Sequence, residues 1–130
     1  MYAETCCELG DATDLTLAKN ALNQVRARAG MASFPYTSTI QGKTVTFSDN
    51  QTDLRTAIRH ERRVELGMEG HRWFDLCRWG IAKETMDNYI NTETDEAKAE
   101  YGTFQKNKNE LFPIPSKEID LTGINQNPNW

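Results

Sequence analysis

Acidic, basic and aromatic side chains interleave at helical spacing between residues 55 and 80 of the chain. A pair of carboxylates in such a segment could hydrolyse a glycosidic bond, which requires one protonated acid beside one ionised acid. The neighbouring arginines argue against this chemistry because nearby cations keep every acid ionised. We therefore interpret the segment as a structural network of ion pairs and aromatic rings, without a catalytic residue. The members of this network are Glu61, Arg62, Arg63, Glu65, Glu69, Arg72, Trp73, Asp75, Arg78 and Trp79.

The histidines and cysteines give no metal-binding pattern. His60 begins the run HERRVE, which lacks the second histidine of a zinc-binding HExxH motif. The cysteines Cys6, Cys7 and Cys77 have no CxxC spacing. No DxDxDG-like run indicates a calcium loop. The sequence thus predicts neither a metal nor another cofactor.

Aromatic side chains are candidates for sugar stacking, in which a ring covers the apolar C–H face of a pyranose. Trp73 and Trp79 lie inside the arginine-rich segment, so we expect them to fill the core. Tyr36 and Tyr101 fall in loop-like stretches and are predicted to be exposed, ligand-binding residues. The remaining candidates are Tyr89 and Trp130.

Charge and hydropathy argue against two classes of protein. The net charge is −4, and the arginines lie among as many acids, so no basic patch is available to bind nucleic acid. No apolar run approaches the roughly 18 residues that a membrane-spanning helix needs. The 130 residues are enough for one compact core. We therefore predict a single domain over residues 1–130.

The first third of the chain predicts a helix pair and a hairpin. Residues 1–9 and 15–29 have apolar positions at three- and four-residue steps, with Asp14 as a cap of the second helix and Gly30 as its stop. The pair has the size of a tetratricopeptide-type repeat. Residues 36–47 are rich in threonine and β-branched side chains on either side of Gln41 and Gly42, which predicts a surface hairpin.

A second strong helix is predicted from about Thr52. Its apolar face includes two glutamates, which need cationic partners once they are buried. Arg72 and Arg78 follow the break at Gly70, so we expect a helix over 72–79 to fold back and supply those partners. The residues of that face are Leu54, Ala57, Ile58, Glu61, Glu65 and Met68.

The last fifty residues predict weaker structure. An amphipathic segment follows Gly80, residues 91–110 are polar with one helical turn, and prolines interrupt the apolar C-terminal end. The predicted fold is therefore a mostly α-helical, irregular domain. It has one tetratricopeptide-like helix pair, a small β-hairpin excursion and an extended, proline-containing C-terminal strap.

Several ordered motifs resemble the C-terminal signature of the SusD/RagB family. The signature residues are ERRVEL at 61–66, EGHRWFDL at 69–76 and RWG at 78–80. Three further segments resemble the same family, namely LFPIP at 111–115, NQNP at 125–128 and the front segment with LNQVRARAG at 22–30. Cys77 departs from the pattern because the family commonly carries an arginine there. The resemblance identifies the chain as a C-terminal fragment of a longer SusD/RagB-like protein.

The resemblance implies a binding function without chemistry. Members of the family capture glycans, or in some cases peptides, and close over a SusC-like TonB-dependent transporter. They sit on the outer face of the outer membrane through a lipid anchor, which is absent from this chain. The alternative is a helical protein–protein interaction module that does not bind carbohydrate. A fragment separated from its partner half is also expected to self-associate through exposed apolar surface.

Overall fold

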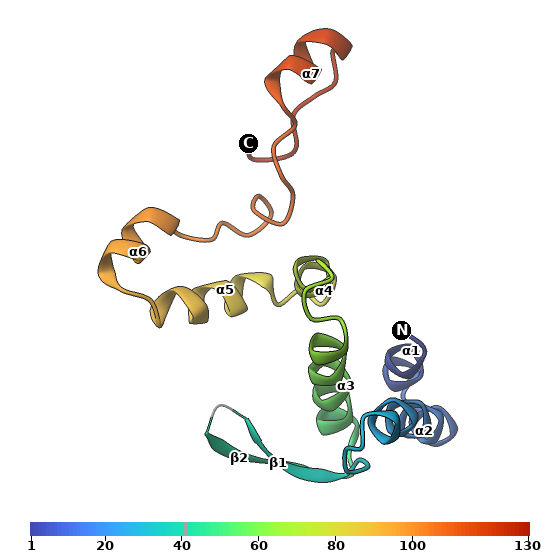
Figure 1. Cartoon of the computed structure of the whole chain (residues 1–130). Coiled ribbons are helices and arrows are strands. Elements are labelled where there is room, and N and C mark those ends of the chain that lie inside the picture. The colour runs from blue at the N-terminus through green and yellow to red at the C-terminus, as the bar shows by residue number, and fades with distance from the viewer. Residues whose placement is uncertain (41) are drawn as a thin grey trace. The chain divides into compact units, whose positions relative to one another are not determined.

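The computed structural model describes residues 1–40 and 42–130, without the side chain of Ile40. The chain forms two compact units, which comprise residues 1–69 and 70–130. Unit 1 contains three helices and a hairpin, and unit 2 contains four helices (Figure 1). None of the described helices is long and apolar enough to cross a lipid bilayer. Each unit is considered separately below.

Unit 1 begins with the predicted helix pair, α1 (Tyr2–Leu9) and α2 (Ala12–Arg28). The cap of α2 is Asp11 and not Asp14, because the extended backbone of Asp11 lets its carboxylate accept the amide hydrogen of Asp14 at 2.8 Å. Gly30 ends the helix as predicted. It adopts a φ of 69°, and the amides of Gly30 and Met31 donate to the carbonyls of Ala27 and Arg26.

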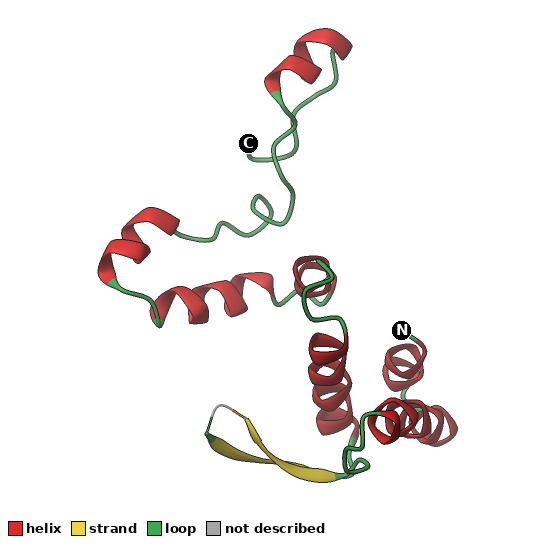
Figure 2. Ribbon diagram, viewed as in Figure 1, coloured by secondary structure: helices red, strands yellow, loops and turns green. Residues whose placement is uncertain are grey.

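The predicted hairpin consists of β1 (Tyr36–Ile40) and β2 (Lys43–Phe47), drawn as the yellow strands of Figure 2. The strands are antiparallel, and Tyr36 lies opposite Phe47. Because strand side chains alternate between the two faces, these two rings are buried while the neighbouring threonines are exposed. The predicted turn residue Gln41 lies outside the described residues.

The long helix of unit 1 is α3 (Gln51–Glu65), which starts one residue before the predicted position. Asn50 caps it by accepting the amide hydrogen of Asp53. Four residues of the predicted face of α3 are buried, Leu54, Ala57, Ile58 and Glu61, and Glu65 is half-buried. Met68 lies beyond the helix end at a φ of 69° and is fully exposed. The core of unit 1 combines Cys6, Cys7, Ala18, Leu22, Phe34, Tyr36, Phe47, Leu54, Ala57 and Ile58.

Unit 2 begins with α4 (Arg72–Arg78), at the predicted position, followed by α5 (Ala82–Asn91). Gly80 separates them at a φ of 69°, where the amides of Gly80 and Ile81 donate to carbonyls of α4. This tight turn lets α4 and α5 share one small core. The core is made of Leu76, Ala82 and Phe104, with Trp73, Cys77, Trp79, Ile81 and Met86 packed against it.

The rest of unit 2 contains α6 (Asp95–Tyr101) and α7 (Ser116–Thr122), joined by extended chain. The C-terminal end holds this extended chain in place. Gln126 exchanges two hydrogen bonds with the backbone of Ile114, at 2.7 and 2.9 Å, and Trp130 Nε1 donates to the carbonyls of Lys108 and Leu111. The seven helices and one hairpin within the described residues confirm the predicted fold class.

Candidate functional site

A buried ion pair organises unit 1. Arg26 Nη1 donates to Glu61 Oε2 at 2.6 Å, and the two side chains are only 4% and 10% exposed. Arg26 Nε also donates to the carbonyl of Ala32 at 2.6 Å. The pair therefore joins the end of α2 to the C-terminal half of α3 and gives the buried Glu61 a cationic partner.

The structure gives both glutamates a partner that the sequence analysis did not name. Glu61 pairs with Arg26, and Glu65 pairs with Arg28, so both of these cations come from α2. Arg26 reaches the core because it continues the buried stripe of Ala18 and Leu22 at four-residue steps. That spacing was the sequence signal that could have identified Arg26 as buried. Of the other predicted network members in unit 1, Arg62 is half-buried, and Arg63 and Glu69 are exposed.

Tyr36 is buried, against the prediction that it is exposed. Its side chain packs on Phe47 with the ring centroids 4.8 Å apart, and the Arg26 guanidinium lies 3.7 Å from the ring centroid. Through this contact the Tyr36 ring attracts the guanidinium, and the carboxylate of Glu61 balances the positive charge of Arg26. Burial raises the pKa of the Tyr36 phenol. The ring is therefore part of the unit 1 core and is not available to stack on a ligand.

A half-exposed ion pair in unit 1 predicts an acid-dependent stability. Arg55 donates from Nε and Nη2 to the two carboxylate oxygens of Glu8, at 2.7 and 2.9 Å, and this bond lowers the pKa of Glu8 below 4.5. Because the folded pKa is lower than the unfolded one, the pair stabilises the protein above pH 4.5 and loses its effect as the pH falls through the folded value. We expect the stability difference between wild type and Glu8→Gln to shrink in acid.

Denaturant titrations of both proteins on either side of pH 4.5 measure this difference. If the stability difference between wild type and Glu8→Gln stays constant as the pH falls, the Arg55–Glu8 pair is not its source.

The signature residues of unit 2 form a second cluster. Arg78 Nε donates to Asp75 Oδ1 at 2.9 Å, and the Asp75 side chain is 6% exposed. The Arg78 and Arg72 guanidinium groups lie 5.0 and 5.9 Å from the centroid of the Trp79 ring. Trp73 packs on Phe104 with the ring centroids 6.1 Å apart. Both tryptophans are half-buried and pack against the core of unit 2.

An open hollow of about 270 Å³ lies between α5, α6 and the chain that follows α6; we call it the aromatic cleft. Tyr89 and Tyr101 line it and are 49% and 58% exposed, while Phe104 beside them is buried. Asn109 and Thr103 add polar groups. The cleft thus combines accessible rings with hydrogen-bonding side chains, which is the combination that a sugar ring needs. Its lining is completed by Met86 and Ile90.

Tyr89 of the aromatic cleft remains neutral at ordinary pH because its pKa is raised. A hydrogen bond to Glu93, and then the negative charge of Glu93, raise the pKa of Tyr89. A neutral phenol keeps the ring face apolar and leaves the hydroxyl able to donate. Of the two tyrosines predicted as ligand-binding residues, Tyr101 lies in this cleft and Tyr36 does not.

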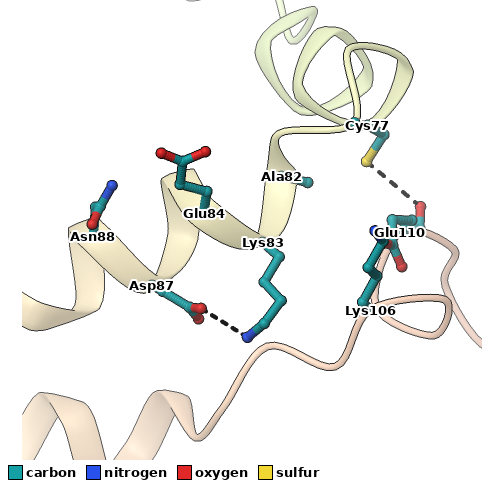
Figure 3. Close-up of a pocket in the computed structure, with 9 residues that line it drawn as sticks. Cys77, Ala82, Lys83, Glu84, Asp87, Asn88, Lys106 and Glu110 are labelled. Carbon is teal, nitrogen blue, oxygen red and sulfur yellow. Dashed lines mark hydrogen bonds and ion pairs between the residues drawn. The ribbon is translucent and has the colours of Figure 1, made fainter.

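A second, larger hollow of about 490 Å³ lies between α5 and the segment 106–110; we call it the polar pocket (Figure 3). Lys83 Nζ donates to Asp87 Oδ2 at 2.7 Å and to the carbonyl of Phe104 at 3.2 Å. Cys77 lies 3.9 Å from the carbonyl oxygen of Glu110. Burial, and then the nearby Glu110 carboxylate, raise the pKa of the Cys77 thiol. The remaining lining is Gly80, Ala82, Glu84, Asn88 and Lys106.

Sequence patterns did not indicate the polar pocket. Its two sides come from an amphipathic helix and from a stretch that the sequence marked only as polar, and no motif connects them. Within the residues that the structure describes, no group of three or more histidine, cysteine or acidic side chains could hold a metal ion.

The family comparison and the comparison with solved structures agree with one another. A family model described as the SusD family matches residues 1–130. A SusD homolog from Bacteroides thetaiotaomicron VPI-5482, known from a crystal structure, has 36% sequence identity and a TM-score of 0.71. The match covers 99% of this chain and 25% of that protein. Among curated proteins, none matches the chain.

Proposed function

Because the chain belongs to the SusD family, we propose that it contributes to the capture of glycans and that the aromatic cleft is where it contacts them. The observation that carries this proposal is the pair of exposed tyrosines, Tyr89 and Tyr101, over a hollow with polar side chains. A sugar ring has an apolar C–H face and a rim of hydroxyls, so it fits a ring face flanked by amide and hydroxyl groups.

Membership of the family supports a proposal for the role of the whole protein. The chain spans a quarter of the homolog that it matches, so the wider assembly is part of the proposal. We propose that the protein acts at the outer surface of the outer membrane, held there by a lipid anchor, and delivers glycans to a SusC-like TonB-dependent transporter. It binds its ligand and does not transform it. The pairing of Glu61 and Glu65 with arginines supports this, because paired carboxylates make poor general acids.

Substitution of the cleft tyrosines tests the proposal. Tyr101→Ala and Tyr89→Ala should each weaken the binding of oligosaccharides by roughly tenfold, about 1.4 kcal/mol, because each removes one stacking face. Isothermal titration calorimetry with malto-, cello-, xylo- and mannohexaose measures the affinities. Tyr101→Phe retains the ring and should keep most of the affinity.

The matched control is Tyr2→Ala, which removes an equally exposed tyrosine, 61% accessible, from α1. It should leave binding unchanged. Equal losses from Tyr2→Ala and Tyr101→Ala, or no loss from either cleft substitution, would refute the cleft as the contact site.

A second candidate function has its own observation. A shallow groove of about 200 Å³ in unit 1 is lined mainly by apolar side chains of α1, α2 and α3, including Ala3, Leu22, Val25 and Ile58. Such a surface suits a protein partner or a second copy of the chain. In this alternative the chain is an interaction module, and oligosaccharides would bind no more weakly to the cleft variants than to the wild type.

A further inference from the structure

We propose that the polar pocket is a second saccharide subsite, which accepts a neutral or amine-bearing sugar unit and rejects acidic ones. The proposal rests on the function proposed above and names the class of glycan that the site selects. The residues that carry it are Glu110, Lys83 and Glu84, together with the position of the pocket along α5.

An unsatisfied acceptor lies in the wall of the pocket. Glu110 Oε2 is buried and has no hydrogen-bond partner. A buried carboxylate oxygen without a donor loses solvation free energy, so the site favours an occupant that donates a hydrogen bond. The hydroxyl groups of neutral sugars and the ammonium group of amino sugars are both donors. Acidic sugars carry hydroxyl donors as well, so the discrimination against them comes from the charges of the lining.

The charges around the pocket select against acidic sugars. Its lining has three carboxylates against two ammonium groups. Lys83 is already engaged by Asp87 and by the carbonyl of Phe104. An acidic sugar would therefore meet Glu84 and Glu110 with only Lys106 to balance its charge. Neutral and amine-bearing sugars avoid this repulsion.

The size and position of the pocket fit an extended ligand. Its volume of about 490 Å³ lies within the range of ordinary small-molecule sites. The aromatic cleft and the polar pocket lie on neighbouring sides of α5, and Lys83 of the pocket donates to the backbone of Phe104, whose ring lines the cleft. An oligosaccharide stacked on Tyr101 can therefore continue along α5 into the pocket, whereas a single sugar fills one hollow only.

Calorimetry with the 130-residue chain tests the subsite. The probes are whichever neutral hexasaccharide of the panel above binds, its disaccharide, a glucosamine hexamer and a hexamer of galacturonic acid. Wild type should bind the neutral and amine-bearing hexamers and not the acidic one. Glu110→Ala should weaken the binding of the neutral hexamer by roughly tenfold. It should not change the binding of the disaccharide, which occupies the aromatic cleft alone.

Three further variants keep the result interpretable. Asn88→Ala replaces an exposed pocket residue, so it should not disturb folding. It should weaken the binding of the hexamer and leave the binding of the disaccharide unchanged. Glu84→Lys reverses one exposed pocket charge and should allow the acidic hexamer to bind. Glu118→Gln, on the exposed face of α7, is the control and should change nothing.

The outcomes separate the two proposals. If Tyr101→Ala weakens the hexamer while Glu110→Ala and Asn88→Ala do not, the subsite is refuted and the cleft stands. Binding of the acidic hexamer by wild type would also refute the subsite. If Tyr101→Ala has no effect on any probe, the proposed function itself fails.

Discussion

Replacing Arg26 with alanine is expected to lower the free energy of unfolding of unit 1 by about 3–5 kcal/mol. The substitution leaves the Glu61 carboxylate in a site where its side chain is 10% exposed and removes its cation. It also removes the guanidinium that lies over the Tyr36 ring and the bond to the carbonyl of Ala32. Because small domains are stable by only about 5–15 kcal/mol, a loss of this size would unfold much of the population on modest heating.

Arg28→Ala is the matched control for Arg26→Ala. Arg28 also pairs with a glutamate of α3, but its side chain is 72% exposed, so its loss should cost at most about 1 kcal/mol. Joint replacement by Arg26→Met and Glu61→Leu should recover most of the stability, because no unpaired charge remains buried. Hydrogen exchange of the α2 and α3 amides measures the stability of Arg26→Ala, of Arg28→Ala and of the double variant. Similar losses from Arg26→Ala and Arg28→Ala would contradict the buried role of Arg26.

Phe104→Ala is expected to be the most damaging single substitution in unit 2, at about 3–5 kcal/mol. Phe104 is 8% exposed, and it forms the small core with Leu76 and Ala82. Truncation leaves a cavity beside Trp73, and among the three buried members of this core only Leu76 is another large side chain. Tryptophan fluorescence during denaturant titration reports this loss, because all three tryptophans of the chain lie in unit 2.

Phe74→Ala provides the comparison for Phe104→Ala. Phe74 lies on α4 but is 67% exposed, so its removal should change the stability by no more than about 0.5 kcal/mol. If the two phenylalanine variants unfold at the same denaturant concentration, Phe104 is not a core residue of unit 2.

Local patterns predicted most of the fold correctly. The helix predicted over 72–79 follows from the helical spacing of its side chains, which depends only on neighbouring residues. The same holds for the buried face of α3 and for the end of α2 at Gly30. The Asp11 cap shows the limit, because two nearby aspartates can both cap and the sequence does not decide which one does.

Long-range pairings were harder to predict. The pattern of α3 showed that Glu61 needs a cation, but it did not show which distant helix supplies it. Tyr36 looked exposed because its segment is polar, while its burial follows from the strand face on which it pairs with Phe47. Glu110 and Lys83 meet in the polar pocket only because the segment 106–110 returns to α5, and no local pattern predicts that return.

A single titration tests the central claim that glycan contact lies in the aromatic cleft of unit 2 and that the arginine-rich signature is scaffold. Amide chemical shifts of the isotope-labelled chain would be followed by NMR while a binding hexasaccharide is added. We predict that the largest shifts fall at Tyr89, Tyr101 and Asn109 and that the amides of Arg26 and Glu61 stay in place. Shifts concentrated around Arg26 and Glu61, with the cleft unchanged, would contradict the account.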